Sequence, residues 1–411
     1  MKRLLKSFSI FFILLSIFIS NPLTVHAVEP DINAQGCALI DVTTGELLYG
    51  KNADGYFEPA STTKVLTALV VLDHCSLDDK VTVTQNFTEI DGTAVGLLKG
   101  DETTVKNLLL GLLLESGNDC ANALAIHVSG SIPEFAKLMN EKSKSIGATN
   151  INFQNPSGLP DNNHVVSPKS LALIMREAVN NKDFIDISTT PNATITMLND
   201  PSRIIVVNNK NYMINKNSKY YYPYAVSGKN GYTTKANHTY VAIAEKDGHL
   251  LVASFLNATD KNQNFFDMQT VFNYGFNNFS LVTLYNKGDT VENYEINSNS
   301  SIPLIATQDI GYVVPKGQEN STSAELKIED VDLSKKSFDE GEIILKGTVL
   351  VNGQEVETVD LAAGESRTYE PPFSKASLSN KSNTPLYICF GVGALALCTG
   401  VGLLIRTKLK R

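Results

Sequence analysis

The residues best suited to chemistry are Ser61 and Lys64, in the segment Ser61-Thr62-Thr63-Lys64. Three residues apart at the start of a helix, the hydroxyl and the amine lie on one face within mutual reach. A serine hydroxyl hardly ionises at neutral pH, so Lys64 must be partly deprotonated to accept its proton, which burial and a second nearby cation can arrange. The pattern predicts a nucleophile, Ser61, activated by Lys64. A helix-capping serine beside a solvated lysine is the alternative for this motif taken alone.

Two further motifs follow in chain order. Ser116-Gly117-Asn118 interrupts a helical region, and Lys229-Asn230-Gly231 stands at the head of a strand. Taken singly, Ser116 and Asn118 could cap a helix break, and Lys229 could be a solvated strand residue. Because they follow the Ser61/Lys64 pair in this order, we expect the three motifs to form one active site.

The order Ser-x-x-Lys, Ser-x-Asn, Lys-x-Gly resembles that of the penicillin-binding proteins and active-site serine β-lactamases, and within them the low-molecular-weight D-alanyl-D-alanine carboxypeptidases. The likeness covers nearly the whole chain and includes four surrounding segments: Pro59–Lys64, Glu115–Asp119, Asn155–Pro160 with His164, and Tyr274–Phe276. It implies a serine-type enzyme that removes the terminal D-alanine from peptidoglycan stem peptides, with β-lactam antibiotics as covalent inhibitors.

The resemblance also implies a role for each matching residue. Ser61 attacks the carbonyl of the terminal D-Ala-D-Ala bond, Lys64 takes its proton, and Ser116 relays a proton to the leaving amine. Backbone N–H groups of Ser61 and Tyr232 form the oxyanion hole. The implied substrate-binding residues are Asn118, which also orients Lys64, Lys229, which helps keep Lys64 neutral, and Asn230, Gly231, Tyr232 and Thr233. The Ser/Lys scheme has no place for His164, which we expect to be a loop or packing residue.

The chain departs from the family pattern at two positions. The family's third motif is Lys-Thr-Gly, but its middle residue here is Asn230, and Asn264 stands where the family usually places an arginine. Both changes fall on groups that bind the substrate's terminal carboxylate, so we expect that recognition to be weakened. Lys235 or Lys261 could compensate as an ammonium point charge.

These departures leave other functions open. A DD-endopeptidase that cuts cross-links would need less from a free carboxylate, and a divergent penicillin-binding protein would show little turnover. A β-lactamase is the least favoured, because no separate Glu-x-x-Leu-Asn run supplies a deacylating base.

The elements that must position these motifs are read from hydrophobic periodicity and turn residues. The pattern predicts an α+β fold in which one antiparallel sheet is covered by helices. A hairpin is expected over 34–49 and another over 239–255, turning at Asp247-Gly248. The expected helices are Pro59–Leu72, Val105–Val128 with its interruption, Ile132–Ile146, Ser167–Asn180 and Phe265–Tyr274.

Beyond Leu281 the pattern becomes all strand. Four strands are expected in a small all-β domain, the last two joined at Asn352-Gly353, a strong hairpin signal: Ser301–Thr307, Ser323–Ile328, Gly341–Val351 and Gln354–Leu361. The predicted organisation is a signal peptide (1–27), a serine transpeptidase-like catalytic domain (28–280), a β-rich domain (281–372), a linker (373–385), a transmembrane helix (386–405) and a cytoplasmic tail (406–411).

The two ends predict export and anchoring. A basic start, an apolar stretch and Val25-His26-Ala27 form a signal-peptide pattern, with an uncleaved anchor as the alternative. Leu386–Ile405 carries no charged residue and is followed by four cations, which favours a spanning helix with the bulk of the chain outside the cell, facing the wall.

The composition narrows the partners. A net charge of −8 gives no basic field, so we expect no nucleic-acid partner. The pattern of Cys and His indicates neither a disulfide framework nor a metal site, and we expect no cofactor. Cys37, Cys75 and Cys120 are interpreted as small buried apolar residues.

Overall fold

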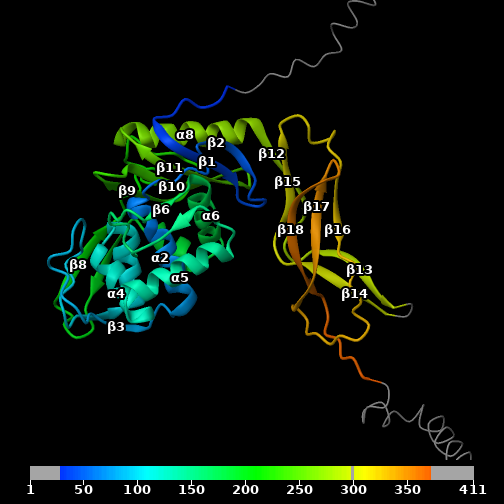
Figure 1. Ribbon diagram of the computed structural model, residues 1–411, viewed down its shortest axis with the longest axis horizontal. Coiled ribbons are helices and arrows are strands. Elements are labelled where there is room, and N and C mark those ends of the chain that lie inside the picture. The colour runs from blue at the N-terminus through cyan, green and yellow to red at the C-terminus, as the bar shows by residue number, and fades with distance from the viewer. Residues whose placement is uncertain (1–27, 298–299, 372–411) are drawn as a thin grey trace, which may run out of the picture. The chain divides into compact units, whose positions relative to one another are not determined.

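The computed structural model describes residues 28–297 and 300–371 of the chain (Figure 1). They form two compact units, each described by itself. The first extends to Leu281 and also includes Val313–Glu319, and the second contains Val282–Tyr312 and continues from Asn320. The predicted signal peptide, linker, transmembrane helix and tail lie outside the described residues. Among the residues described, no helix is long and apolar enough to cross a membrane.

The first unit is built on a five-stranded antiparallel sheet of order β2-β1-β11-β10-β9. The two predicted hairpins supply four of the strands, and Asp247 and Gly248 both adopt the positive φ that a tight turn between β10 and β11 requires. The strand bounds are β1 Ala34–Asp41, β2 Leu47–Lys51, β9 Ala225–Thr233, β10 Asn237–Lys246 and β11 His249–Ala258.

Alternating side chains place apolar residues on both faces of this sheet, so both faces must be covered. Ile40, Val241 and Val252 contact the larger core, which includes α2, α4, α5 and α6. Leu39, Tyr240 and Phe255 contact a second core beneath α8. Figure 1 shows α8 on one side of the sheet and the other helices opposite. The predicted antiparallel sheet covered by helices is therefore confirmed.

The predicted helices are all present, with differences at their ends, and one further helix occurs among the described residues. Their bounds are α2 Thr63–His74, α3 Val105–Leu110, α4 Asn118–Ser129, α5 Ile132–Ser145, α6 Pro168–Val179, α7 Lys182–Ser188 and α8 Lys261–Asn278. The short helix α7 was not predicted, and α8 extends well beyond the predicted Phe265–Tyr274. Ser131, Ser167, Asn181 and Asp260 cap their helices by accepting a hydrogen bond from a backbone N–H in the first turn.

Two catalytic motifs lie at irregular points of the helices. A 3-10 turn, Ala60–Thr62, precedes α2, so Ser61 lies ahead of the α-helix predicted to begin at Pro59. A π-helical turn, Gly111–Glu115, joins α3 to Ser116, which has a left-handed backbone with φ of 72°. The predicted interruption of the second helical region is thus confirmed, and it turns Ser116 out of the helix.

The strand that carries Lys229 begins earlier than predicted. Lys229-Asn230-Gly231 lies in the second half of β9 rather than at its head. Pairing with β10 runs from Ala225 opposite Ala244 to Thr233 opposite Asn237. The glycines, lysine and asparagine of this segment have low strand propensity. The segment is nevertheless a strand because it pairs with β10.

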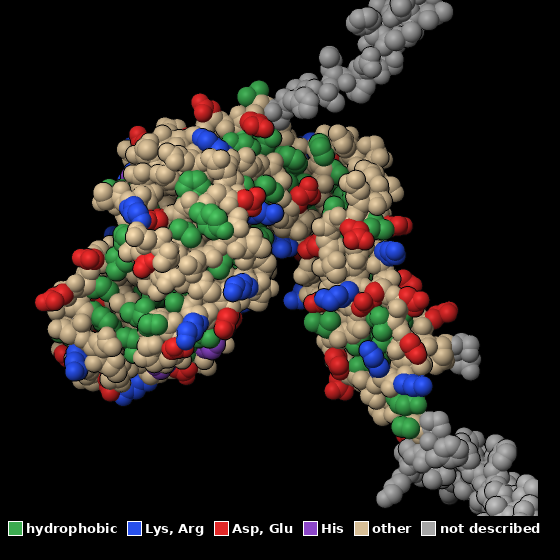
Figure 2. All heavy atoms as spheres, in the orientation of Figure 1, with side chains coloured by type: hydrophobic (Ala, Val, Ile, Leu, Met, Phe, Trp, Pro, Cys, Tyr) green, Lys and Arg blue, Asp and Glu red, His purple; other side chains and the backbone are tan. Residues whose placement is uncertain are grey.

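Three small two-stranded sheets complete the first unit. They are β3 Lys80–Thr82 with β4 Glu102–Thr104, β5 Ile151–Asn152 with β6 Val165–Val166, and β7 Asn192–Thr196 with β8 Ile204–Asn208. Strand β7 was not predicted from the sequence. On the face drawn in Figure 2, basic and acidic side chains are interspersed rather than gathered by sign.

The second unit is all β, as predicted. Its five-stranded sheet has the order β13-β14-β18-β17-β16, and the turn at Asn352-Gly353 joins β17 and β18 with both residues at positive φ. A two-stranded sheet pairs β12 with β15, and each of these strands has residues assigned to both units. The bounds are β12 Phe279–Tyr285, β13 Thr290–Asn297, β14 Ser300–Ala306, β15 Ile310–Pro315, β16 Ala324–Ile328, β17 Ile343–Val351 and β18 Gln354–Ala363.

Candidate active site

Lys64 and Ser61 lie in contact at the start of α2. The Lys64 side chain is fully buried, and its Nζ lies 3.0 Å from Ser61 Oγ, 2.7 Å from Asn118 Oδ1 and 2.6 Å from the Ser157 carbonyl oxygen. The amide and carbonyl oxygens can only accept hydrogen bonds. In a neutral amine both N–H groups would donate to them, which leaves the nitrogen lone pair facing the Ser61 hydroxyl. The three contacts therefore orient Lys64 as a base.

The surroundings of Lys64 favour that neutral form. Burial holds the pKa of Lys64 well below its ordinary value, and the nearby positive charge of Lys229 lowers it further. Burial also lowers the pKa of Lys229 to about 7, partly opposed by Glu115. Lys229 Nζ donates to the Asn230 carbonyl oxygen at 2.9 Å. Near neutral pH the charge of Lys229 therefore influences that of Lys64.

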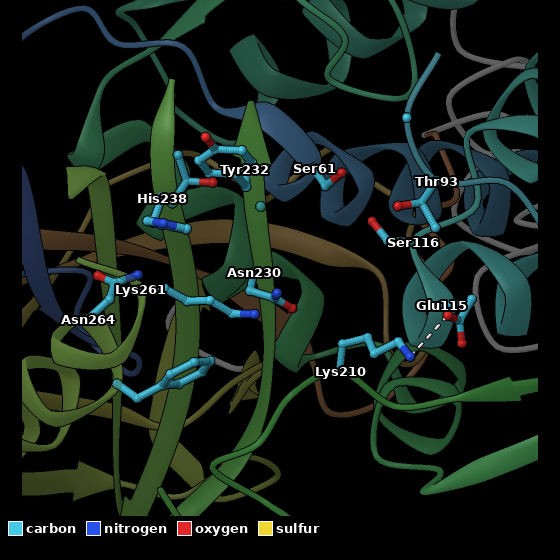
Figure 3. Close-up of a pocket in the computed structure, with 14 residues that line it drawn as sticks. Ser61, Thr93, Glu115, Ser116, Lys210, Asn230, Tyr232, His238, Lys261 and Asn264 are labelled. Carbon is cyan, nitrogen blue, oxygen red and sulfur yellow. Dashed lines mark ion pairs between the residues drawn. The ribbon is translucent and has the colours of Figure 1, made fainter. Parts of the chain in front are cut away.

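Ser116, in the second motif, lines the same cavity as Ser61. Ser116 Oγ is buried and has no hydrogen-bond partner among the described residues. Its left-handed backbone follows the π-helical turn and directs the side chain into the cavity shown in Figure 3. Asn118 accepts from Lys64 through Oδ1 and donates through Nδ2 to the Asp91 carbonyl oxygen at 2.7 Å. Asn118 is thereby locked in one orientation.

Asp119 holds the loop that faces Ser116, a role that the sequence did not reveal. Its buried carboxylate accepts hydrogen bonds from the backbone N–H groups of Val95, Gly96 and Leu97 at 2.8–3.1 Å. Successive N–H groups converging on one carboxylate fix a loop firmly. Thr93, two residues earlier in this loop, lines the cavity.

The Asn155–Pro160 segment supplies the carbonyl that contacts Lys64. Asn155 Oδ1 accepts hydrogen bonds from the backbone N–H groups of Ser157, Gly158 and Leu159. Gly158 has φ of +81°, and a Cβ there would lie 1.8 Å from the Ala60 carbonyl oxygen. Only glycine allows this loop to approach the turn that carries Ser61.

Strand β9 approaches the same turn from the other side. A Cβ at Gly231 would lie 2.6 Å from the Ser61 backbone nitrogen, and Thr239 Oγ1 on β10 donates to the Pro59 carbonyl oxygen at 2.8 Å. These contacts bring Asn230 and Tyr232 to the cavity that contains Ser61. Thr233 does not line that cavity, and its hydroxyl accepts from the Ala236 N–H instead.

The cavity over Ser61 has a volume of about 460 Å³. Figure 3 shows Ser61 between Tyr232 of β9 and Ser116, with His238 of β10 and Lys261 and Asn264 of α8 farther along the cavity. Of the predicted site residues, it contains Ser61, Ser116, Asn230, Gly231 and Tyr232 in its lining, whereas Lys64, Asn118 and Lys229 are buried beside it. His238, Lys261 and Asn264 also line it.

The two candidate compensating lysines differ in position. Lys235 forms an ion pair with Glu58 and does not line the cavity. Lys261 lines the cavity, one helical turn before Asn264 on α8, and makes no ion pair among the residues described. Lys210 lines the cavity but is paired with Glu115 at 3.0 Å. Lys261 is thus the lining cation available to an incoming anion.

His164 packs in the interior, as predicted, and two of the three cysteines are buried, as predicted. His164 Nε2 lies 3.0 Å from Thr63 Oγ1, and its Nδ1 accepts from the Gln154 N–H at 3.1 Å. Burial lowers the pKa of His164 to about 4, so the ring is neutral near pH 7. Cys37 and Cys120 are buried, whereas Cys75 is partly exposed, which corrects its interpretation as a buried residue. It follows the last turn of α2, where the helix end leaves its side chain partly open to solvent.

A buried lysine aimed at a serine, beside a cavity that presents a second serine, defines an acyl-transfer site of the active-site serine class. Residues 23–260 match the family described as D-alanyl-D-alanine carboxypeptidase, and residues 279–369 match the C-terminal domain of penicillin-binding protein 5. The chain belongs to the D-alanyl-D-alanine carboxypeptidase family, and is a serine carboxypeptidase of the penicillin-binding type.

Individual relatives agree with this assignment. D-alanyl-D-alanine carboxypeptidase DacB2 of Mycobacterium tuberculosis is 35% identical over 252 residues, 60% of this chain and 84% of that protein. DacF of Bacillus subtilis is 28% identical over 305 residues, 72% of this chain and 77% of that protein. Penicillin-binding protein 5 of Haemophilus influenzae, 24% identical, shares the fold with a TM-score of 0.65 over 83% of this chain and 99% of that structure.

Proposed function

We propose that this chain removes the terminal D-alanine from peptidoglycan stem peptides through an acyl-enzyme on Ser61. The observation that carries the proposal is the set of three contacts around Lys64 Nζ, with Ser61 Oγ at 3.0 Å. Two acceptor-only partners hold the amine so that its remaining position faces the nucleophile.

The acylation step uses Lys64 as the base. Lys64 Nζ takes the Ser61 hydroxyl proton as Oγ attacks the carbonyl carbon of the last peptide bond. Negative charge develops on the carbonyl oxygen, where the backbone N–H groups of Ser61 and Tyr232 would stabilise it. The close approach of Gly231 to the Ser61 nitrogen supports this pairing of donors.

The leaving group requires a proton as the C–N bond breaks. Ser116 Oγ lines the cavity and has no partner among the described residues, so it is available to pass a proton from Lys64 to the departing amine of D-alanine. Water then attacks the Ser61 ester, with Lys64 again taking a proton, and releases the shortened peptide.

Recognition of the terminal carboxylate falls to Lys261. The family's hydroxyl and arginine positions hold Asn230 and Asn264 here, and both line the cavity. In Figure 3 the Lys261 side chain points from the start of α8 toward Asn230. The Lys261 ammonium and a side-chain amide can together bind the carboxylate in place of the two parallel hydrogen bonds of an arginine. They constrain the orientation of the carboxylate less than an arginine does.

We also propose that the chain is exported and held at the cell membrane by residues 386–405, so that the catalytic unit faces the cell wall. The uncharged apolar run and the cations that follow it support this topology. Protease treatment of intact cells should cleave the catalytic unit of the full chain. Protection of the catalytic unit, with cleavage after lysis only, would contradict it.

The activity is tested by incubating the purified full chain with a D-Ala-D-Ala pentapeptide and measuring free D-alanine. A parallel sample with labelled penicillin reports acylation, and Ser61→Ala serves as the inactive control. Release of D-alanine that is lost in Ser61→Ala is the expected result. Acylation by penicillin without D-alanine release would reject the carboxypeptidase function. Cleavage of a cross-linked stem-peptide dimer, supplied as a second substrate, without D-alanine release from the pentapeptide would identify an endopeptidase.

A further inference from the structure

A second cavity of about 580 Å³ lies in the first unit, beside the β7–β8 hairpin. The chain lines it from the end of α7, from the segment that follows β8 and from the start of β9. Six of its lining residues are asparagines: Asn192, Asn208, Asn209, Asn211, Asn215 and Asn217. Lys216 is the charged residue of the lining, and no acidic residue contributes.

Asn211 lines this cavity, and its side chain carries a donor that is unpartnered within the described part of the chain. Its side chain is 2% exposed, and its Oδ1 accepts hydrogen bonds from the Tyr240 hydroxyl at 2.5 Å and the Met213 N–H at 3.2 Å. Its Nδ2 is buried and has no partner among the described residues. A buried donor without an acceptor is costly.

Asn192 and Asn208 add a pair of free amides. They lie directly opposite each other across the β7–β8 pairing, where side chains on one face of an antiparallel pair are close neighbours. Both side chains are exposed and make no hydrogen bond within the described parts of the chain. By contrast, Asn209 is fully engaged, donating to the Ser188 and Thr190 carbonyl oxygens.

This cavity borders the catalytic one. The Asn208 backbone N–H donates to Glu115 Oε2 at 3.0 Å while its side chain lines the second cavity. Two residues on, Lys210 lines the catalytic cavity and pairs with the same Glu115. The short segment between them therefore separates the two cavities, and a substrate seated at Ser61 could extend across it.

We propose that the asparagine-lined cavity binds N-acetylated amino sugars of the glycan to which stem peptides are attached. An acetamido group carries one donor and one acceptor, which a side-chain amide matches in both senses. The six asparagine amides, which outnumber the single charge of Lys216, suit a neutral saccharide. The identification of the ligand as peptidoglycan glycan rests on the proposed function. The binding of an N-acetylated sugar by the cavity does not.

The test measures binding of a β-1,4-linked N-acetylglucosamine tetramer to the full chain by calorimetry or ligand-observed NMR. The variant Asn192→Ala/Asn208→Ala removes two exposed side chains and leaves the backbone pairing intact. Asn293→Ala, at an exposed position of β13 in the other unit, is the matched control. We expect the double variant to bind about tenfold or more weakly, and the control to bind as the unaltered chain does.

A β-1,4-linked glucose tetramer, which lacks the acetamido groups, is the control ligand. The inference is overturned by no saturable binding of the acetylated tetramer, by equal binding of the glucose tetramer, or by undiminished binding to the double variant. D-alanine release from a sugar-free pentapeptide should be equal in the double variant and the unaltered chain. If neither releases D-alanine but asparagine-dependent binding persists, the proposed function fails and the saccharide site stands.

Discussion

The carbonyl oxygen of Ser157 lies 2.6 Å from Lys64 Nζ, although 93 residues separate them in the chain. This contact, with the Asn118 amide, decides which way the lysine lone pair points. The base is therefore oriented by two segments that contain neither the nucleophile nor the lysine. Disturbing either segment should affect catalysis without touching Ser61.

Gly158→Ala is predicted to disrupt that orientation. The new Cβ would lie 1.8 Å from the Ala60 carbonyl oxygen, so the loop or the Ser61 turn must move. We expect a loss of stability of about 3 kcal/mol or more and a fall in penicillin acylation. Gly147→Ala is the matched control, because Gly147 also has positive φ, +83°, but open space around it. Equal effects of the two substitutions on unfolding free energy and acylation rate would contradict the steric argument.

Removing Lys229 is predicted to shift the pH profile of acylation. Its positive charge adds to burial in lowering the Lys64 pKa, so Lys229→Ala should raise that pKa and move the ascending limb to higher pH. The acylation rate of Lys229→Ala should therefore fall below that of the unaltered chain at pH values under 7, where Lys229 is charged. The Lys229 pKa is about 7, so the unaltered chain also loses this charge above neutrality.

The two profiles should therefore converge above about pH 8, beyond the Lys229 pKa. Lys229→Arg, which keeps the charge, should retain the original limb. A uniform reduction in rate at every pH would show instead that Lys229 acts on substrate binding alone.

Lys261→Met is predicted to weaken recognition of the free carboxylate. Losing a charged hydrogen bond of about 1.5–3 kcal/mol corresponds to a fall in kcat/KM of roughly tenfold to a hundredfold for a pentapeptide acid. The matching pentapeptide carboxamide should be affected little. Lys235→Met is the control, since Lys235 pairs with Glu58 outside the cavity. An equal loss on acid and carboxamide would assign Lys261 a role other than carboxylate binding.

His164 is predicted to make stability depend on pH between about 6.5 and 4. Burial lowers its folded pKa to about 4 from 6.5, so in this window the unfolded chain binds more protons and the free energy of unfolding falls as pH falls. The full loss is about 3 kcal/mol. His164→Gln should flatten this dependence in urea unfolding at pH 7 and pH 4.5, whereas the exposed His127→Gln should not. If the unfolding free energy of His164→Gln depended on pH as strongly as that of the unaltered chain, another group would cause the dependence.

Local spacing predicted that Ser61 and Lys64 lie within reach of each other, and the order of the three motifs led to their interpretation as nucleophile and base. Periodicity likewise gave most helices and the two hairpins of the central sheet. The contacts of Ser157 and Asp119 could not be predicted, because both are made by loops that meet only after the sheet and helices pack. The Asn155–Pro160 segment was noticed through its family likeness, but the carbonyl that it offers to Lys64 was not.

The boundaries of β9 and the neighbouring cavity show the same limit. Lys229 lies well inside the strand because pairing with β10 overrides a weak local strand signal. Asn192 and Asn208 become partners through β7, which no sequence pattern indicated. The sequence likewise could not show which of Lys235 and Lys261 lines the cavity, because both are ordinary lysines in the sequence. Their three-dimensional positions decide it.

The central claim is that Ser61 is the nucleophile and Lys64 its base. Mass spectrometry of the full chain after brief exposure to penicillin, followed by proteolysis, tests it most directly. We predict a single penicilloyl adduct on the peptide that contains Ser61, absent in Ser61→Ala and formed about a thousandfold more slowly in Lys64→Met. An adduct on another residue, or labelling of Lys64→Met at the rate of the unaltered chain, would contradict the account.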